Sequence, residues 1–584
     1  MKYYKKYVTP YLSAFILGPI FMIVEVLGEV ILPKLMSMII NYGCGQDASA
    51  VARGPAYIIG LGVVMIVTAL LMMLGGVLGA YFAVKASVNF AADLRKDIFE
   101  KVQKFSFANI EKFSTGSLVT RLTNDITNMQ NVISMGLRML LRSPGMLIGG
   151  LIMAFLMNAK LALVFCVVIP ILIIALVLVM KNAFPRFDVM QTKIDALNSR
   201  IQENITNQRV VKSFVRDDFE KETFDRASSD LKDKTLRAMK VVILTMPIMT
   251  LTMNITVMAV VWFGGQQILV GDMPVGDLTA FTTYVTQILM SLMMMSMIMI
   301  QGSRAMASSH RILEVLGTEI DLNDDMAQRK DLTVREGKIE FRHVSFRYYK
   351  KHKKNVLQDL SFVANPGEVV GIIGSTGSGK SSLVQLIPRL YDCDEGEVLV
   401  DGVNVRDYSL RNLRNGVAMV LQKNTLFSGS IMENLRWGDE NATDEEVYEM
   451  AKAAQADGFI RETKEGYGRE LGQGGVNVSG GQKQRLCIAR ALLKKPKILI
   501  LDDSTSAVDT ATEAEIRKSF STSLRDATKL IIAQRISSVE DADRILVLEE
   551  GHIVGQGTHK ELLESCETYQ EIYYSQKDKE EVAG

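Results

Sequence analysis

The chain contains one glycine-rich stretch, Gly374-Ser375-Thr376-Gly377-Ser378-Gly379-Lys380-Ser381, between an apolar segment, 368–373, and a short helical segment, 381–384. A loop of small residues between a strand and a helix can close its backbone N–H groups around phosphate oxygens. Lys380 is then placed to reach the terminal phosphates, and the Ser381 hydroxyl is placed to bind Mg²⁺. The stretch therefore predicts a P-loop nucleotide-binding domain of the α/β class.

A second apolar strand lies far downstream of this loop. It is Ile498-Leu499-Ile500-Leu501, and it ends in Asp502, whose carboxylate can steady the same Mg²⁺. The strand and helix around the loop, together with Asp502, make a chance match to the bare pattern improbable. ATP and Mg²⁺ are the predicted cofactors. The predicted nucleotide contacts of the loop are Gly374, Ser375, Thr376, Gly377, Ser378, Gly379, Lys380, Ser381 and Ser382.

Length and composition point to two unlike halves. The chain has 584 residues, too many for one ordinary domain, and its net charge of +1 does not indicate a nucleic-acid partner. Long apolar runs continue to about Met306, and charged, alternating segments follow. The five cysteines lack the spacing of a metal site or a disulfide framework. We expect a membrane domain at 1–317, a linker at 318–338, a nucleotide-binding domain at 339–576 and a charged tail at 577–584.

Six apolar stretches in the first half are long enough to cross a membrane, which takes roughly 20 residues. They lie at 11–40, 56–84, 132–157, 161–180, 241–263 and 278–300. Lysines precede the first stretch, whereas 264–277 contains no Lys or Arg, so the positive-inside rule places the N-terminus in the cytoplasm. The charged segments 85–130 and 181–240 then lie on the same side, where apolar residues at helical spacing predict two extended hairpins.

Charged and sulfur-containing side chains stand out inside these stretches. Glu25 and Glu29 share one helix face, and so do Arg138 and Arg142, since the members of each pair are four residues apart. Buried ionisable groups are expensive in lipid, so these four either pair with each other or line a wet cavity that contacts substrate. The sixth stretch is rich in methionine, whose flexible thioether suits either a surface for ligands of varied shape or ordinary packing.

The pentapeptide Val478-Ser479-Gly480-Gly481-Gln482 resembles the signature of the ATP-binding cassette (ABC) transporters. Over essentially its whole length the chain resembles ABC exporter half-transporters. This resemblance implies an all-α membrane domain of six helices, the type I exporter or type IV ABC fold, fused to a cytosolic α/β P-loop ATPase domain. It also implies that Tyr348 stacks on adenine, that Gln422 contacts Mg²⁺ and faces the membrane domain, and that Ser506-Ala507-Val508-Asp509 is the D-loop.

In this family two ATPase domains face each other head to tail, and each ATP lies between the phosphate loop of one subunit and the signature of the other. The resemblance therefore makes Ser479-Gly480-Gly481-Gln482 a site for the partner's nucleotide, and a helix N-terminus suits a γ-phosphate. It also implies coupling turns around Thr115-Gly116 and at 209–214. The Mg²⁺ ligands that it implies are Ser381, Gln422 and, through water, Asp502.

Three positions depart from the family pattern. Asp503 stands where the family carries a glutamate that polarises the attacking water, and Gln534 stands where it carries a histidine. Aspartate is shorter by one methylene, about 1.5 Å, and a misplacement of about 1 Å can cost on the order of 10²-fold in rate. An amide can hydrogen-bond a phosphate but cannot become cationic. Gln473-Gly474 replaces Glu-Arg, which weakens the expected cross-talk through that loop unless a neutral contact replaces it.

We therefore predict a site that binds ATP well and hydrolyses it weakly, in a heterodimer whose partner half-transporter carries the glutamate and the histidine. A slow homodimer is the competing interpretation. The favoured function is ATP-driven export of amphipathic compounds or drugs across the bacterial plasma membrane, with membrane lipid and a small amphipathic substrate as further partners and no nucleic acid. A flippase for lipids or lipid-linked precursors is the first alternative. An ATP-sensing regulatory subunit is an alternative of another class.

Overall fold

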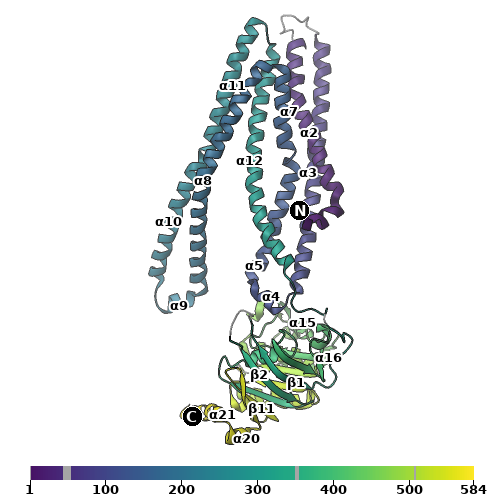
Figure 1. Ribbon diagram of the computed structural model, residues 1–584, viewed down its shortest axis with the longest axis vertical. Helices are drawn as coiled ribbons and strands as arrows, with labels where there is room; N and C mark the ends of the chain where they lie inside the picture. The colour runs from purple at the N-terminus through teal and green to yellow at the C-terminus, as the bar shows by residue number, and fades with distance from the viewer. Residues whose placement is uncertain (1, 44–53, 326, 349–353, 505–507, 584) are drawn as a thin grey trace. The chain divides into compact units, whose positions relative to one another are not determined.

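The computed structural model describes residues 2–43, 54–325, 327–348, 354–504 and 508–583 (Figure 1). Its internal contacts divide the chain into two units, which we call the helical unit and the α/β unit. The helical unit comprises Met1–Lys101 and Gly116–Gly317. The α/β unit comprises Val102–Thr115 and Thr318–Gly584, so a short piece of the N-terminal half belongs with the C-terminal half.

Within the part of the chain that the structure describes, six helical stretches are long and apolar enough to cross a membrane, in agreement with the predicted number. They are Lys5–Gly43, Pro55–Gln103, Thr115–Met157, Ala159–Thr206, Asp217–Val270 and Val275–Met295. Their α-helices are α1 (Lys5–Val8), α2 (Leu12–Met38), α3 (Pro55–Gln103), α5 (Thr115–Thr120), α6 (Ile126–Met139), α7 (Arg142–Met157), α8 (Ala159–Thr206), α10 (Asp217–Ile243), α11 (Thr245–Val270) and α12 (Val275–Gly317). The short 3-10 and π segments beside them are η1 (Lys2–Tyr4), η2 (Thr9–Tyr11), η3 (Ile39–Gly43) and η4 (Arg121–Asp125).

A long hairpin extends from the apolar part of the helical unit. α8 and α10 pack side by side along it, and α9 (Gln208–Ser213) lies at its tip (Figure 1). Ion pairs hold the two long helices together: Lys193 lies 2.8 Å from Asp230, and Arg200 lies 3.2 Å from Glu220. At the tip the aromatic ring of Phe214 is 74% exposed. The hairpin therefore ends in an apolar side chain that its own unit does not cover.

The apolar core of the helical unit joins its first and last helices to α8. The rings of Phe165 and Phe281 stack with their centroids 5.6 Å apart, and both are fully buried. The phenol of Tyr284 on α12 donates a hydrogen bond of 2.7 Å to the carbonyl of Val30 on α2. Buried Asp277 accepts a 3.1 Å hydrogen bond from Asn41 Nδ2. The buried Tyr284 hydroxyl and the Asp277 carboxylate are thus both hydrogen-bonded, as low-dielectric surroundings require.

One ionic group joins α2 to α7 inside the membrane-spanning region. Arg142 Nη2 lies 3.2 Å from Glu25 Oε1 and 2.8 Å from Glu29 Oε1. Arg138 forms no ion pair within the described part of the chain. Of the two interpretations left open by the sequence, internal pairing therefore applies to Glu25, Glu29 and Arg142. Two carboxylates still face one guanidinium, and Oε2 of each glutamate is buried without a hydrogen-bond partner among the described residues.

The described residues of the α/β unit form three sheets. The main sheet has the order β12-β11-β3-β10-β9-β6, parallel except for β12, and a second, antiparallel sheet has the order β2-β1-β4-β5. A small two-stranded sheet pairs β7 with β8. The strands are β1 (Ile339–Phe346), β2 (Leu357–Ala364), β3 (Val369–Gly374), β4 (Glu395–Val400), β5 (Val403–Asn404), β6 (Val417–Val420), β7 (Gly429–Ser430), β8 (Glu470–Leu471), β9 (Ile498–Asp502), β10 (Thr528–Ile532), β11 (Arg544–Glu549) and β12 (His552–Gly557).

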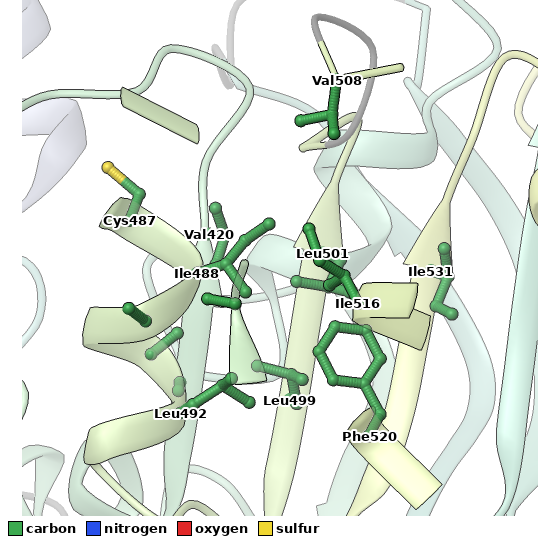
Figure 2. Close-up of a cluster of buried hydrophobic side chains, with 14 of the residues drawn as sticks. Val420, Cys487, Ile488, Leu492, Leu499, Leu501, Val508, Ile516, Phe520 and Ile531 are labelled. Carbon is green, nitrogen blue, oxygen red and sulfur yellow. The ribbon is translucent and has the colours of Figure 1, made fainter. Parts of the chain in front are cut away.

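Helices bury the apolar faces of the main sheet. Figure 2 shows Ile488 and Leu492 of α18 directed toward Leu499 of β9, with Ile516 and Phe520 of α19 beside the same sheet. Each of these side chains is at most 3% exposed, and full burial of one such group is worth roughly 1.5–3 kcal/mol. The helical elements are α13 (Lys380–Gln385), α14 (Leu410–Gly416), α15 (Ile431–Arg436), α16 (Asp444–Ala453), α17 (Asp457–Arg461), η5 (Gly466–Gly468), η6 (Gln473–Gly475), α18 (Gly480–Leu493), α19 (Thr510–Ser523), η7 (Ile536–Ser538), α20 (His559–Ser565) and α21 (Glu567–Ala583).

The α/β unit also includes α4 (Phe107–Lys112), which comes from the N-terminal half of the chain. A capping box between Ser106 and Asn109 begins this helix. The ring of Phe107 lies 6.0 Å from the ring of Tyr391, whose hydroxyl donates a 3.0 Å hydrogen bond to Glu111. We expected a coupling turn around Thr115-Gly116; the helix that packs against Tyr391 ends at Lys112, before that turn.

Candidate nucleotide site

The phosphate loop lies between β3 and α13, at the carboxyl edge of the main sheet. Its backbone requires glycine at two positions. Gly379 has a φ of 97°, and a Cβ on Gly374 would lie 2.1 Å from the carbonyl oxygen of Leu548. The loop therefore has small residues where the backbone must approach phosphate closely.

Lys380 is the first residue of α13. Its Nζ donates hydrogen bonds of 2.8 Å to the Gly374 carbonyl and 2.7 Å to the Ser375 carbonyl, so the side chain folds back over the loop. Burial lowers the pKa of Lys380 below its ordinary value, while the charges of Asp502 and Asp503 oppose that shift. A cation held at this position is placed to bind phosphate oxygens.

The predicted Mg²⁺ ligands lie together beside the loop. Ser381 Oγ donates a 3.0 Å hydrogen bond to Asp502 Oδ1, and Gln422 lines the same cavity. Asp502 is 3% exposed, and burial raises the pKa of its carboxyl group against the hydrogen bond from Ser381. Hydroxyl, carboxylate and amide oxygens are hard ligands that suit Mg²⁺, which keeps water and phosphate oxygens as its remaining ligands. The donor set therefore fits this ion.

Most of the predicted contacts line one cavity of about 540 Å³. Tyr348 lies at its edge, where its hydroxyl is 2.8 Å from Ser382 Oγ and its ring packs at right angles to the ring of Tyr391. Ser378 lines a neighbouring cavity instead. The predicted residues in the shared cavity are Tyr348, Gly374, Ser375, Thr376, Gly377, Gly379, Lys380, Ser381, Ser382, Gln422, Asp502, Asp503 and Gln534.

Two amides hold the carboxylate of Asp503. Gln534 Nε2 donates a 2.7 Å hydrogen bond to Asp503 Oδ2, and Gln422 Nε2 donates to the same oxygen at 3.3 Å. The backbone of Asp503 has a φ of 47°, a left-handed conformation that aspartate tolerates better than most residues. The two residues that depart from the family pattern are therefore direct hydrogen-bond partners.

The sequence did not point to the part that α21 plays at this cavity. Ile572 and Gln576 of α21 line it, and Gln576 Nε2 donates a 2.8 Å hydrogen bond to the carbonyl of Gln534. Gln576 Oε1 also accepts a 2.9 Å hydrogen bond from the backbone N–H of Ile536. One side chain thus bridges both ends of the turn after β10. No motif marks this glutamine, because its contacts with Gln534 and Ile536 form only when α21 packs beside the turn after β10.

The signature residues form the start of α18 and do not line the described nucleotide cavity. Ser479 Oγ accepts from the N–H of Gln482 at 3.3 Å, and Gln482 Oε1 accepts from the N–H of Ser479 at 3.0 Å. Ser479 and Gly480 are exposed, so this helix N-terminus is open to an anion from another molecule. The replaced pair Gln473-Gly474 lies close by in sequence, in η6.

The D-loop is described only in part. Asp509 is the N-cap of α19, and its side chain accepts a 2.9 Å hydrogen bond from the N–H of Thr512. That backbone hydrogen bond lowers the pKa of Asp509 below its ordinary value. Ser506 and Ala507 lie outside the described residues.

Comparison with known proteins identifies both halves. Residues 15–292 match the family described as the ABC transporter transmembrane region, and residues 357–506 match the family described as ABC transporter. The uncharacterized ABC transporter ATP-binding protein YfiB of Bacillus subtilis is 41% identical over 565 residues, 96% of each chain. The ATP-dependent lipid A-core flippase of Pseudomonas aeruginosa is 33% identical over 575 residues, 95% of this chain and 93% of the flippase.

A solved structure shares the fold over nearly the whole chain. It is that of a bacterial Atm1-family ABC exporter with ATP bound, with a TM-score of 0.79 at 24% sequence identity and 98% of both chains covered. The predicted fold, six membrane helices fused to a C-terminal α/β nucleotide-binding domain, is thereby confirmed. With the six apolar helices and the bacterial relatives, the predicted inner-membrane location is confirmed as well.

Proposed function

The chain belongs to the ABC transporters as an ATP-driven exporter half-transporter, and we propose that it works in a heterodimer in which its own phosphate loop holds ATP with little hydrolysis. The partner half-transporter then supplies the glutamate and histidine of a competent site. This chain contributes Ser479-Gly480-Gly481-Gln482 to that competent site. Closing and opening of the paired ATPase domains switches the membrane domains between inward and outward access.

The observation that carries this proposal is the hydrogen bond of 2.7 Å between Gln534 Nε2 and Asp503 Oδ2. A general base must reach the attacking water with a lone pair. The carboxylate of Asp503 is one methylene shorter than that of a glutamate, and hydrogen bonds from Gln534 and Gln422 to its Oδ2 hold it at that shorter reach. Gln534 also cannot supply the cationic form that a histidine could. Weak hydrolysis follows from both features.

The open signature helix supports the same division of labour. In a homodimer both signatures would close over nucleotides that are hydrolysed slowly. An intact, exposed N-terminus of α18 is useful when the nucleotide that it meets is cleaved quickly. A partner with a competent site gives it that use.

The test is to purify the chain alone and together with a second half-transporter that carries glutamate and histidine at the two positions. We expect slow ATP turnover alone and fast turnover in the pair. Asp503→Ala should change the activity of the pair little, whereas Ser479→Arg in this chain should abolish most of it. Fast turnover by the chain alone that is lost in Asp503→Ala would contradict the proposal.

For the cargo, we propose amphipathic compounds, because flexible methionine side chains on α11 and α12 suit ligands of varied shape. A lipid flippase is the second candidate, favoured by the 33% identity to a protein named as a lipid A-core flippase. The ionic group of Glu25, Glu29 and Arg142 offers both signs of charge to a head group.

Proteoliposomes separate the two candidates. ATP-dependent efflux of a cationic amphipathic dye, without movement of a fluorescent phospholipid between leaflets, supports export of soluble amphiphiles. Movement of the phospholipid without dye efflux supports the flippase and contradicts the first candidate.

A further inference from the structure

We propose that the α/β unit contains an anion-binding site, suited to a compact multivalent oxyanion such as phosphate, at the edge of its main sheet opposite the nucleotide cavity. The site is a cavity of about 530 Å³ between β3, α19, β10 and the segment after η7. Val369 begins β3 and Lys529 lies near the start of β10, so both mark the amino ends of these parallel strands. Gly374 and Asp502, in the nucleotide cavity, end their strands at the carboxyl edge.

The lining of this cavity is strongly cationic. Of the residues that the structure describes, Asp541 is the one whose carboxylate lines it. Asp526 and Asp543 act on Lys529 electrostatically, but neither lines the cavity or forms an ion pair with Lys529 within the described part of the chain. The four cationic side chains are those of Arg517, Lys518, Arg525 and Lys529.

Lys529 is the most informative of these residues. It is 4% exposed, and its Nζ donates a 2.8 Å hydrogen bond to the carbonyl of Ala527. A buried ammonium group without a countercharge costs several kcal/mol. Burial accordingly lowers the pKa of Lys529. Asp526 and Asp543 attract this ammonium group without forming an ion pair with it in the described part of the chain, and an anion in the cavity would supply a countercharge in direct contact.

Arg517 gives a second, independent sign of a ligand. Its Nη1 donates a 2.8 Å hydrogen bond to the carbonyl of Ser537, whereas its Nε is buried and has no hydrogen-bond partner in the described ranges of the chain. A buried donor left unsatisfied costs about 1–3 kcal/mol. Planar guanidinium groups bind oxyanions through paired N–H donors, so an oxyanion satisfies this nitrogen and Lys529 together.

The site also touches the loop that carries Gln534. Ser537, held by Arg517, belongs to η7, which follows Gln534 in the chain. An oxyanion bound to the Arg517 guanidinium would therefore contact a side chain that is hydrogen-bonded to Ser537. Ser537 belongs to the same turn as Gln534, whose carbonyl accepts a hydrogen bond from Gln576. This inference does not depend on how fast the nucleotide site hydrolyses ATP.

The experiment uses the full chain in detergent, saturated with a non-hydrolysable ATP analogue so that the phosphate loop is occupied. Inorganic phosphate is titrated against chloride at equal ionic strength, and both binding heat and thermal unfolding are measured. We expect phosphate to bind and to raise Tm, and Lys529→Met and Arg517→Gln each to weaken binding at least about tenfold, the effect of losing one charged hydrogen bond. Lys464→Met is the control, because Lys464 is exposed and does not line this cavity. This variant should bind phosphate as the parent does.

Methionine fills most of the space of the lysine side chain without its charge, and removing a buried charge also removes its desolvation cost. Lys529→Met should therefore stay folded, and Arg517→Gln provides a second variant if it does not. The proposal is wrong if phosphate and chloride act alike on the parent protein. It is equally wrong if folded Lys529→Met and Arg517→Gln proteins bind phosphate as tightly as the parent.

Discussion

The two sides of the nucleotide cavity differ in what they are equipped to do. On one side the phosphate loop has its glycines, Lys380, and the Ser381–Asp502 pair in the arrangement that ATP and Mg²⁺ binding needs. On the other side Asp503 is held by Gln534 and Gln422. The proposed function assigns binding and cleavage to separate residues of one cavity. One function can therefore decline while the other is kept.

Placing glutamate and histidine at positions 503 and 534 should change the hydrolysis rate more than any other substitution proposed below. The double substitution Asp503→Glu with Gln534→His lengthens the carboxylate and replaces the amide that holds it. We expect single-turnover hydrolysis at this chain's site to rise on the order of 10²-fold, the scale of a correction of about 1 Å in position. Rapid-quench measurement with the partner's site disabled checks this. Asp503→Asn with Gln534→His is the matched control, and an equal rise in that control would contradict the proposed role of the carboxylate.

Substitution of Lys380 in the phosphate loop should lower the affinity for ATP instead. Lys380→Ala removes a charged donor to phosphate, so the affinity for ATP should fall roughly 10- to 100-fold. Asp503→Ala should leave ATP affinity nearly unchanged. Equilibrium binding of a fluorescent ATP analogue measures both variants. A larger loss in Asp503→Ala than in Lys380→Ala would reverse the comparison.

Lowering the pH should weaken Mg²⁺ binding at Asp502 by a smaller factor. Burial raises the pKa of Asp502, so protons compete with Mg²⁺ at a higher pH than for an ordinary aspartate. We expect the apparent Mg²⁺ affinity of the ATP complex to fall as the pH is lowered from about 7.5 to about 5.5, because a raised pKa brings protonation of Asp502 closer to neutral pH. Asp502→Asn should bind Mg²⁺ weakly at both pH values. A parent protein whose affinity does not change over this range would refute the expectation.

The smallest effect concerns the contact of α21 with the turn after β10. Gln576→Ala removes two hydrogen bonds, each worth about 0.5–1.5 kcal/mol, so amide hydrogen exchange at Ile536 should speed up. Gln576→Glu keeps the acceptor for the Ile536 N–H and should largely preserve its protection. Equal exchange in Gln576→Ala and the parent would show that the turn does not rely on α21.

The sequence predicted the fold well because its signals are local and repetitive. Apolar runs of membrane-spanning length, and a glycine-rich turn between a strand and a helix, are visible without any long-range contact. The same holds for the gathering of Lys380, Ser381 and Asp502, since parallel strands end at a common edge. The functional roles of these residues stay predictions.

The features that could not be predicted from the sequence are contacts between residues that lie far apart in the chain. Gln576 acts through the backbone of Gln534 and Ile536, and a lone glutamine in a polar helix carries no period or motif. Pairing of Arg142 with Glu25 and Glu29 was one of two open interpretations, because helix-face spacing does not tell which helices pack together. The cationic cavity around Lys529 likewise joins residues from separate elements.

The membership of α4 in the α/β unit has a practical consequence for anyone who would study the ATPase domain in isolation. A fragment cut at Thr318 lacks Val102–Thr115, and with it the ring of Phe107 and the carboxylate of Glu111 that cover Tyr391. Such a fragment would expose the aromatic surface of Tyr391 to solvent and tend to aggregate. A synthetic peptide of Val102–Thr115, added during refolding, should restore solubility, because the natural border of this module is not a single point in the chain.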